Sequence, residues 1–274
     1  MSDNAPLLAI ARSIAVEAAH LARQRRQDGV EIAASKSSPE DVVTAADREV
    51  EELIRRRLAE ARPDDGFLGE ESGSGGGTSG LTWVVDPIDG TVNYLYGIPS
   101  YAVSIAVVEG EPDPATWTAL AGAVVNGATG EVTTASRGGG AERDGVALQV
   151  SAPSSLSLAL VGTGFGYDAG RRMRQGAVVQ ELLGSVRDIR RIGSAALDLC
   201  SVATGQLNAY YERGLNPWDL AAGALIAEEA GARVAGLDGA PFGSGLGERL
   251  HLVRAQAAQQ ILQLGEKRIR CRDE

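Results

Sequence analysis

Trp83-Val84-Val85-Asp86-Pro87-Ile88-Asp89-Gly90-Thr91 is the stretch that decides the fold, because an apolar strand ends there in two carboxylates. The run Gly69-Glu70-Glu71-Ser72 places another acid after a predicted strand, and Asp219 opens a helical pattern far downstream. Carboxylates gathered without histidine or cysteine suit hard divalent cations such as Mg²⁺, which prefer oxygen ligands. The sequence therefore predicts a metal-dependent enzyme.

The turn within this stretch has the local shape that a metal site needs. Pro87 fixes its own φ and biases Asp86 towards an extended conformation. Both aspartates and the carbonyl of Ile88 can then point into one pocket. Gly90 permits close backbone approach, and Thr91 begins a short helix whose free N–H groups can hold a phosphate. An Asx-type turn explains the motif equally well when it is read alone, and the other acids favour the metal interpretation.

Composition limits the class of protein. The chain has 274 residues, of which 44% are hydrophobic and 23% charged, as expected for one large globular domain or two smaller ones. No apolar run approaches the roughly 20 residues of a membrane span, and the N-terminus lacks the features of a signal peptide. Cys200 and Cys271 are too few for a disulfide framework. We expect a cytoplasmic protein without a membrane contact.

Charge and histidine content argue against two further classes of protein. The net charge of −10 argues against a nucleic-acid partner, because binding to a phosphate backbone needs clustered cations. Metal ions can still reverse the local field and attract an anionic substrate. Neither His20 nor His251 lies beside a serine or cysteine in a nucleophile motif, so triad chemistry is not expected.

Periodicity in the first half predicts helices followed by an antiparallel meander. Apolar residues recur at helical spacing over 6–27, and a capping box of Thr44 and Asp47 opens a second helix. Apolar runs alternate with turn residues over 101–150, the last of them at 147–150, which is typical of antiparallel strands.

In the second half strands alternate with helices, which indicates an α/β layer. The strands are expected at 156–162, 186–192, 209–211 and 233–235, and the helices at 170–184, 194–204 and 218–230. We expect a boundary near residue 152, with an α+β metal-binding part over 1–152, an α/β part over 153–274, and the site at their junction.

Some segments have a plain structural interpretation. The glycine-rich segment 72–80 is either a surface loop or a mobile flap near the metal site. Glu51-Glu52 and Glu228-Glu229 are expected on solvated helix faces, and Asp198 as a structural hydrogen-bonding group. Glu71 should point away from its neighbour Glu70, because side chains alternate along an extended chain.

The motifs together resemble the signature segments of the inositol monophosphatase family, in the family's order and over nearly the whole chain. The matching segments are Lys36-Ser37-Ser38-Pro39, Thr44-Ala45-Ala46-Asp47, Gly69-Glu70-Glu71-Ser72, the stretch from Trp83 to Tyr94, the stretch from Arg191 to Leu199, and Pro217-Trp218-Asp219-Leu220. The resemblance implies a layered αβαβα sandwich of the inositol monophosphatase and fructose bisphosphatase type.

The resemblance also implies a role for each site residue. The ligands of two or three Mg²⁺ ions would be Glu70, Asp86, the carbonyl of Ile88, Asp89 and Asp219. The groups that position and deprotonate the attacking water would be Glu70, Thr91 and Asp47. Gly90 and Thr91 would donate backbone N–H groups to the phosphate of the substrate, and Arg190, Ala195 and Glu212 would contact its alcohol portion. Asp89 and Asp219 would also bind the substrate.

The implied chemistry is physically reasonable for this residue set. The negative charge of a phosphate monoester repels an anionic nucleophile. Paired metals about 3.5–4 Å apart lower the pKa of water, align the attack and stabilise the leaving alkoxide. No covalent nucleophile is then required. We expect direct attack of metal-activated water on myo-inositol 1-phosphate and related small monoesters, and the family resemblance adds lithium sensitivity and a homodimer.

Two alternatives stay open. The same chemistry on histidinol phosphate or fructose 1,6-bisphosphate is an enzymatic one, and Asn216 weakens the substrate assignment because animal inositol monophosphatases carry a histidine there. A protein that binds RNA-polymerase and ribosomal-RNA complexes is the non-enzymatic one, because some bacterial relatives do so.

Overall fold

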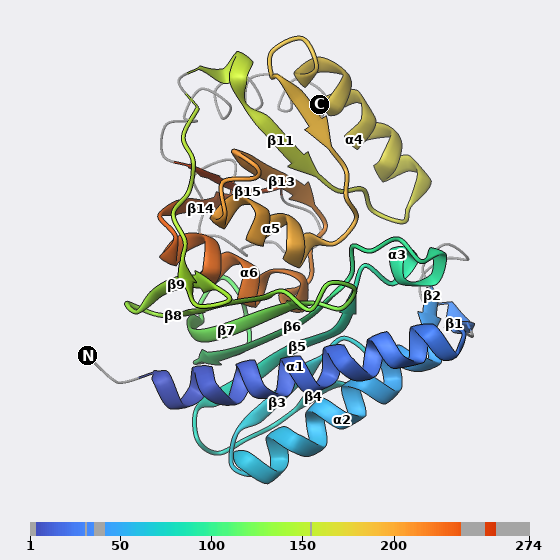
Figure 1. Ribbon diagram of the computed structural model, residues 1–274, viewed down its shortest axis with the longest axis vertical. Helices are drawn as coiled ribbons and strands as arrows, with labels where there is room; N and C mark the ends of the chain where they lie inside the picture. The colour runs from blue at the N-terminus through green and yellow to red at the C-terminus, as the bar shows by residue number, and fades with distance from the viewer. Residues whose placement is uncertain (1–3, 31, 36–41, 154, 237–249, 256–274) are drawn as a thin grey trace.

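The computed structural model describes residues 4–30, 32–35, 42–153, 155–236 and 250–255, and it stacks them in layers (Figure 1). From bottom to top these layers are a helix pair, an eight-stranded sheet, a second helix pair, a five-stranded sheet and one last helix. This order is the predicted αβαβα sandwich, so the predicted fold class is confirmed.

The first layer consists of α1 (Ala5–Asp28) and α2 (Ala45–Ala61), which pack against each other beneath the large sheet. Residues at helical spacing, Ala11, Ile14 and Ala18 among them, bury one face of α1. Thr44 and Asp47 form the predicted capping box at the start of α2. Both predicted helices of the first half are therefore confirmed.

By length and composition alone, α1 is apolar enough to cross a membrane. The expectation that no segment reaches this threshold is therefore wrong for α1. A core helix passes the same test, and α1 is one: its buried face lies on β6 (Ala102–Glu109) and β7 (Thr118–Asn126).

The large sheet has the strand order β10-β9-β8-β7-β6-β5-β3-β4. Its other strands are β3 (Gly66–Gly69), β4 (Gly73–Gly75), β5 (Leu81–Asp89), β8 (Val132–Ser136), β9 (Gly140–Arg143) and β10 (Val146–Ala147). All neighbours are antiparallel except β3 and β5, which run parallel. The predicted meander is confirmed, and part of the glycine-rich segment 72–80 forms the edge strand β4.

The predicted strand at 147–150 is wrong. The strand β10 ends at Ala147, and the N–H of Leu148 makes a last bond to the carbonyl of Ala141 in β9, at 2.9 Å. The N–H of Val150 bonds instead to the carbonyl of Ala230 in the next layer, at 3.0 Å. Periodicity also missed β9, which begins at the end of the turn Gly138-Gly139-Gly140. Glycines hide the alternation of side chains on which strand prediction depends.

The middle layer is the helix pair α5 (Ala195–Ala203) and α6 (Pro217–Glu229), which lies between the two sheets. Small residues allow close packing there. A Cβ on Gly122 of β7 would stand 3.0 Å from the Cα of Ala222 in α6. Every residue from 220 to 227 in α6 is buried. One apolar cluster joins the large sheet to both helices, and the chain division near residue 152 stays a prediction.

The second sheet has the order β12-β11-β13-β15-β14. Its strands are β11 (Leu160–Thr163), β12 (Asp188–Arg190), β13 (Ala209–Arg213), β14 (Ala232–Gly236) and β15 (Leu250–Ala255), and α4 (Ala169–Leu182) covers its outer face. The predicted α/β alternation is confirmed. The strand expected from 156 begins only at Leu160, because Leu156–Leu158 form the short 3-10 helix η1. The strand expected over 186–192 shortens to β12.

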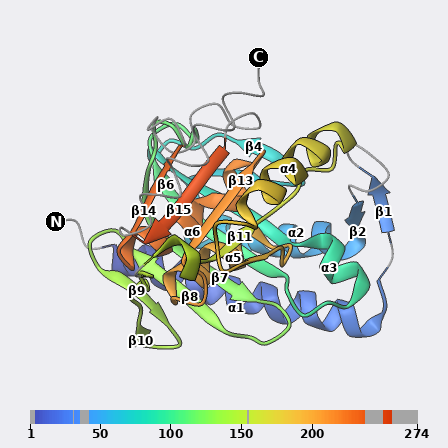
Figure 2. The ribbon, with the colours of Figure 1, turned by 90° about the horizontal axis from the view of Figure 1, so that it is seen from above.

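The short hairpin of β1 (Ile32–Ser35) and β2 (Val42–Thr44) lies at the same end of the molecule as α3 (Thr91–Tyr96), as the view from above shows (Figure 2). Residues of β2 contact α3. The start of α2, which follows Thr44, is thereby brought next to the start of α3.

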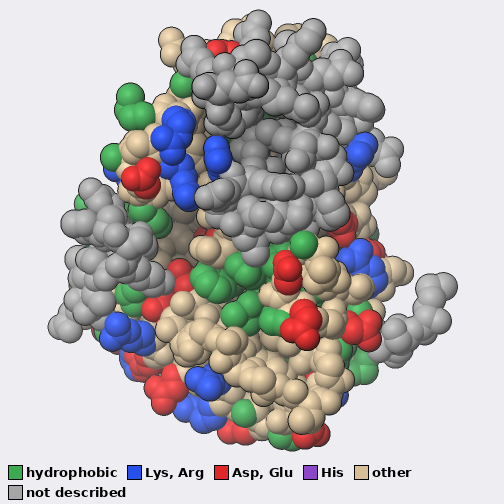
Figure 3. All heavy atoms as spheres, turned by 180° about the vertical axis from the view of Figure 1, so that it is seen from behind, with side chains coloured by type: hydrophobic (Ala, Val, Ile, Leu, Met, Phe, Trp, Pro, Cys, Tyr) green, Lys and Arg blue, Asp and Glu red, His purple; other side chains and the backbone are tan. Residues whose placement is uncertain are grey.

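Two acids at the end of α6, which were expected on a solvated face, are partly exposed and also bind neighbouring groups. Glu228 pairs with Arg137 at 3.0 Å, and Glu229 accepts the backbone N–H groups of Gly138 and Gly140 at 2.9 and 3.0 Å. These bonds tie the end of the middle layer to the β8–β9 turn. On the described part of the face in Figure 3, basic and acidic side chains are interspersed.

Candidate metal centre

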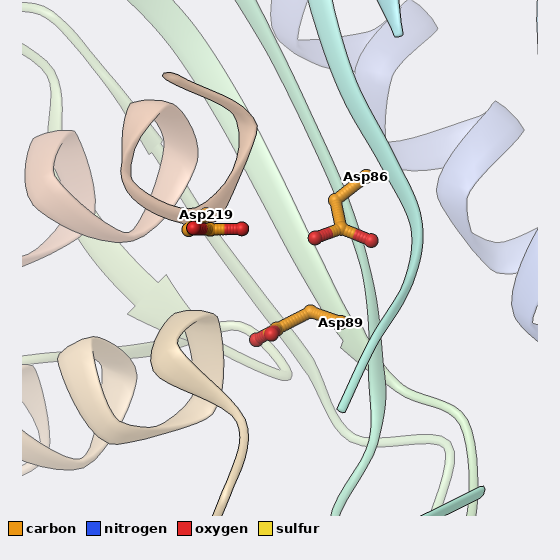
Figure 4. A group of neighbouring side chains, drawn as sticks. All are labelled: Asp86, Asp89 and Asp219. Atoms are coloured by element: carbon orange, nitrogen blue, oxygen red, sulfur yellow. The ribbon is translucent and has the colours of Figure 1, made fainter. Parts of the chain in front are cut away.

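Three aspartates from two layers meet at the end of β5. Carboxylate oxygens of Asp86, Asp89 and Asp219 all lie within 4.8 Å of one another (Figure 4). Asp86 and Asp89 belong to β5, and Asp219 lies in the first turn of α6. The layered fold thus joins residues that are 130 or more positions apart in the chain.

An irregularity in β5 lets both of its aspartates face α6. Residues three apart on a regular strand point to opposite faces of the sheet. The pairing of β5 with β6 shifts between Asp86 and Asp89, where Pro87 interrupts the ladder. The N–H of Ile88 turns back and donates to Oδ1 of Asp86 at 3.1 Å. The predicted turn is therefore present, and it brings the two carboxylates to one side.

Burial and mutual repulsion disfavour the charged forms of these acids. Asp86 is 1% exposed, and burial followed by the charge of Glu70 raises its pKa well above the usual range. Burial and then the charges of Asp89 and Glu70 likewise raise the pKa of Asp219 well above its usual range. A bound divalent cation would offset this repulsion. The donor set of carboxylate oxygens therefore fits a hard divalent cation.

Glu70 stands beside this cluster. Its N–H donates to the carbonyl of Val85 at 3.2 Å, which fixes the end of β3 to β5. A hydrogen bond between the carboxyl groups of Glu70 and Asp86 contributes to the raised pKa of Asp86. The structure thus brings together the four carboxylates that the sequence proposed as ligands.

Glu51 is buried, which corrects its assignment to a solvated face. It is 3% exposed, and its Oε2 accepts the N–H of Glu71 at 2.8 Å. A Cβ on Gly69 would lie less than 3.0 Å from Oε2 of Glu51, so the glycine makes room for this acid. Glu51 therefore holds the backbone beside Glu70.

Thr91 and Asp47 form a second polar pair near the end of β5. Oγ1 of Thr91 lies 3.2 Å from Oδ1 of Asp47 and 3.1 Å from the carbonyl of Ile88, and its one proton can go to either acceptor. Oδ2 of Asp47 accepts from the N–H of Thr44 at 2.8 Å and from its hydroxyl. Asp47 is 1% exposed, so the helix cap holds it in a fixed orientation.

Asp89 is also held from the middle layer. Its Oδ2 accepts from Oγ of Ser194 at 2.6 Å and from the N–H of Ala196 at 2.7 Å. These bonds lower the pKa of Asp89 against a larger rise from burial, and the net direction is upward. Ser194 is not among the site residues predicted from the sequence. Its position before a helical pattern is the signal of an N-cap, which it is.

Gly90 has a conformation that only glycine adopts easily. Its φ is +90°, and a Cβ there would stand 3.0 Å from the carbonyl of Ser100 and 3.1 Å from that of Gly193. The segment before α5 can therefore pass directly over the end of β5. This close approach places Ala195, which is 9% exposed, beside Asp89.

The two arginines before α5 differ in their surroundings. Arg190 is exposed and pairs with Asp188 at 2.6 Å. The charge of Arg191, in contrast, lowers the pKa of Asp89 and of Glu212. Arg191 is thus the arginine whose field reaches the acids, and a substrate role for Arg190 stays a prediction.

Glu212, near the end of β13 in the second sheet, lies close enough to Asp219 for its charge to contribute to the raised pKa of that acid. Glu212 is partly exposed, and the hydroxyl of Tyr210 donates to it. Burial raises the pKa of Glu212 to about 7, against the opposing effect of the Tyr210 bond. Asp198 lies nearby in α5, and burial followed by the charge of Glu212 raises its pKa well above the usual range. Oδ1 of Asp198 has no hydrogen-bond partner among the described residues, so its predicted structural bonding is not seen at that atom.

The site combines carboxylates from the end of a strand and the start of a helix with a partly buried threonine–aspartate pair. The protein is thus a layered α/β protein that can hold divalent cations. A model of the inositol monophosphatase family matches residues 3–269. The inositol-1-monophosphatase of Mycobacterium leprae is 50% identical over 256 residues, which are 85% of this chain and 84% of the relative. A Nus factor SuhB of Xylella fastidiosa is 43% identical over 202 residues, 73% of this chain and 70% of the relative.

The solved structures agree with this likeness. Mycobacterium tuberculosis SuhB matches with a TM-score of 0.80 and 41% identity, and the match covers 98% of each chain. This chain belongs to the inositol monophosphatase family. It is a metal-dependent phosphoric monoester hydrolase, as predicted.

Proposed function

We propose that this protein hydrolyses myo-inositol 1-phosphate and related small polyol phosphate monoesters, with Mg²⁺ as cofactor. The observation that carries the proposal is the approach of Asp86, Asp89 and Asp219 to within 4.8 Å of one another. The inositol-1-monophosphatase name of the Mycobacterium leprae relative supports the choice of substrate.

Glu70, the three aspartates and the carbonyl of Ile88 would hold two or three Mg²⁺ ions. When bound, the ions lower the pKa of water and offset the charge of the phosphate. Asp86 and Asp89 are held rigidly, because Oδ1 of Asp86 accepts the N–H of Ile88 and Oδ2 of Asp89 accepts two donors from the segment before α5. Rigid ligands keep the phosphate in one orientation for in-line attack.

Thr91 and Asp47 would move the proton of the attacking water. The hydroxyl of Thr91 can accept a proton from water only while it passes its own towards an acceptor. Oδ1 of Asp47 is such an acceptor, at 3.2 Å. Glu70 would help to orient the same water. Gly90 and Thr91 would donate backbone N–H groups to the phosphate, and Asp89 and Asp219 would also contact the substrate.

The alcohol portion of the substrate would lie towards the second sheet. Ala195 and Glu212 would border it, and Glu212 can accept a hydrogen bond from a ring hydroxyl. Of the arginines, Arg190 was expected there, and Arg191 has the charge that acts on Asp89 and Glu212. Asn216 donates its N–H to Asp219 at 2.6 Å, so it supports the helix start.

Three finer properties belong to the same proposal: cytoplasmic location, a homodimer, and inhibition by Li⁺. The last two follow from the family resemblance. Sedimentation velocity measures the mass in solution, and a titration of turnover with LiCl against a KCl control measures the inhibition. A monomeric mass would reject the homodimer, and turnover insensitive to Li⁺ would reject the inhibition. Neither result would contradict the proposed hydrolysis.

A substrate panel tests the proposal directly. Protein stripped with EDTA should be inactive, and Mg²⁺ should restore phosphate release. The value of kcat/KM should be highest for myo-inositol 1-phosphate, with histidinol phosphate and fructose 1,6-bisphosphate as competitors. A clear preference for either competitor would change the substrate but keep the chemistry. Absence of Mg²⁺-dependent release from every ester would reject the function.

A further inference from the structure

Gly164, directly after β11, leaves the space in which the carboxylate of Glu212 lies. A Cβ at residue 164 would stand less than 3.0 Å from Oε1, Oε2 and Cδ of Glu212, a separation that real Cβ atoms essentially never show. The two residues come from neighbouring parallel strands, since Thr163 pairs with Tyr211. Any side chain at residue 164 would therefore displace this carboxylate.

Gly164 is not explained by backbone conformation. Its φ lies outside the positive range that L side chains rarely adopt, so alanine can take the same backbone shape. The nearest atoms to the missing side chain all belong to Glu212. A glycine is thus needed at residue 164 because the carboxylate of Glu212 occupies the place of a side chain there.

Tyr210 also holds the carboxylate of Glu212, through a hydrogen bond. Its hydroxyl donates to Oε2 of Glu212, and its ring is 1% exposed within the apolar cluster that contains Leu199 and Leu220. Residues two apart on a strand point to the same face, so both side chains extend from β13 in one direction. A buried ring fixes the direction of its hydroxyl, and the hydroxyl fixes the carboxylate.

Glu212 is partly exposed to solvent. Its charge contributes, after burial and the charges of Asp89 and Glu70, to the raised pKa of Asp219, so the two carboxylates lie close enough to interact electrostatically. Only a carboxylate held at a fixed place can distinguish hydroxyl positions on a substrate, because a misplaced acceptor leaves the hydroxyl unpaired.

We propose that Gly164 and Tyr210 are positioning residues that set substrate specificity by fixing the Glu212 carboxylate against a hydroxyl of the alcohol portion. The inference rests on the proposed function, in which Glu212 contacts that portion. The preferred ligands are therefore phosphate monoesters of polyols, and esters without hydroxyl groups gain nothing from these two residues.

The test compares Gly164→Ala with the control Gly184→Ala. A Cβ on Gly184 meets nothing within 4 Å, and φ there is not positive. The substrates are myo-inositol 1-phosphate and p-nitrophenyl phosphate, which has no hydroxyl group on its leaving group. Gly164→Ala should raise KM for the inositol ester about tenfold or more, the range for a lost hydrogen bond to a charged group. For Gly164→Ala, the kinetic constants on p-nitrophenyl phosphate should stay within about twofold of wild type. For Gly184→Ala, the constants on both substrates should stay within the same range.

A double-mutant cycle separates positioning from general damage. With Glu212→Ala in the background, Gly164→Ala should have no further effect on KM, because the displaced group is gone. Tyr210→Phe removes one hydroxyl at nearly constant shape and should also raise KM for the inositol ester alone. This variant keeps the test decisive if Gly164→Ala fails to fold.

The possible outcomes separate a failure of this inference from a failure of the proposed function on which it rests. Equal losses on both esters, unchanged KM in Gly164→Ala and Tyr210→Phe, or full additivity with Glu212→Ala would each overturn the positioning role. Wild-type protein that releases phosphate from neither ester in Mg²⁺ would instead reject the proposed function.

Discussion

Oγ1 of Thr91 lies within hydrogen-bond distance of Oδ1 of Asp47, at 3.2 Å, while the other oxygen of Asp47 caps α2. The carboxylate of Asp47 therefore caps the start of a helix and also lies against the hydroxyl of Thr91, near the three aspartates. Because the cap holds Asp47 in place, the Thr91 hydroxyl has a proton acceptor in a fixed position, and metal binding and proton transfer become separable by mutation.

Thr91→Val should separate these two roles. The change removes the hydroxyl at nearly constant shape and leaves every proposed ligand. We expect kcat to fall by roughly 10²–10⁴, the range for a lost general acid–base contribution, with little change in Mg²⁺ affinity. Calorimetric Mg²⁺ titration and steady-state kinetics on one preparation measure both. A joint collapse of affinity and turnover would mean that Thr91 supports the geometry of the site instead.

Asp89→Asn should weaken the metal centre. The amide can no longer neutralise a cation, and its nitrogen cannot accept from Ser194 and Ala196 as Oδ2 does at 2.6 and 2.7 Å. We expect kcat to fall by several orders of magnitude. The protein should still fold, because β5 is held in the sheet by its backbone pairing with β3 and β6 and not by the contacts of the Asp89 side chain. Circular dichroism provides the control for folding. Near-normal turnover at saturating Mg²⁺ would contradict the assigned site.

Mg²⁺ should stabilise the protein, most strongly above neutral pH. Burial and mutual repulsion raise the pKa values of Asp86 and Asp219, and the pKa of Glu212 is about 7. A raised folded pKa means that stability is intact at low pH and is lost as the pH rises through that value. Without metal, Tm should therefore fall between pH 5 and pH 8.

Free Mg²⁺ at 100 times its Kd should restore about 2.7 kcal/mol to the free energy of unfolding. Calorimetric Tm values with EDTA and with Mg²⁺ across this pH range measure the effect, with Ca²⁺-free KCl buffer of equal ionic strength as the control. A metal-free Tm that rises from pH 5 to pH 8 would show that these acids are not buried together.

Asp198→Asn should stabilise the protein at high pH. Burial and the charge of Glu212 raise the pKa of Asp198, and its Oδ1 has no partner among the described residues. The native state thus favours the protonated acid, and stability is lost as the pH rises through the folded pKa. Each unit of that shift costs about 1.4 kcal/mol once the group is ionised.

The neutral amide avoids this cost, so the gain in Tm over wild type should be larger at pH 8 than at pH 5. Asp113→Asn, in an exposed turn, is the control for the loss of one carboxyl group. A gain independent of pH would point to packing of the amide, and a loss at pH 8 would mean that Asp198 is charged and compensated in the folded protein.

Local patterns predicted much of this fold. The helical spacing of α1, the Thr44–Asp47 capping box and the meander of β6, β7 and β8 depend on neighbours in the sequence, and all three were expected. The errors came where that information is absent. Three glycines conceal the start of β9, and Val150 leaves the strand pattern because its partner, Ala230, lies in another layer.

For the site, the sequence by itself determined the ligand chemistry, because Asp86, Asp89 and Thr91 stand in one turn and their spacing is local. Only the tertiary structure decided which distant groups join them. Ser194 reaches Asp89, Glu51 is buried beneath Gly69, and Glu212 occupies the space over Gly164. Such contacts depend on how separate layers pack, because burial and available volume determine which side chains meet. The spacing of residues along the chain does not specify them.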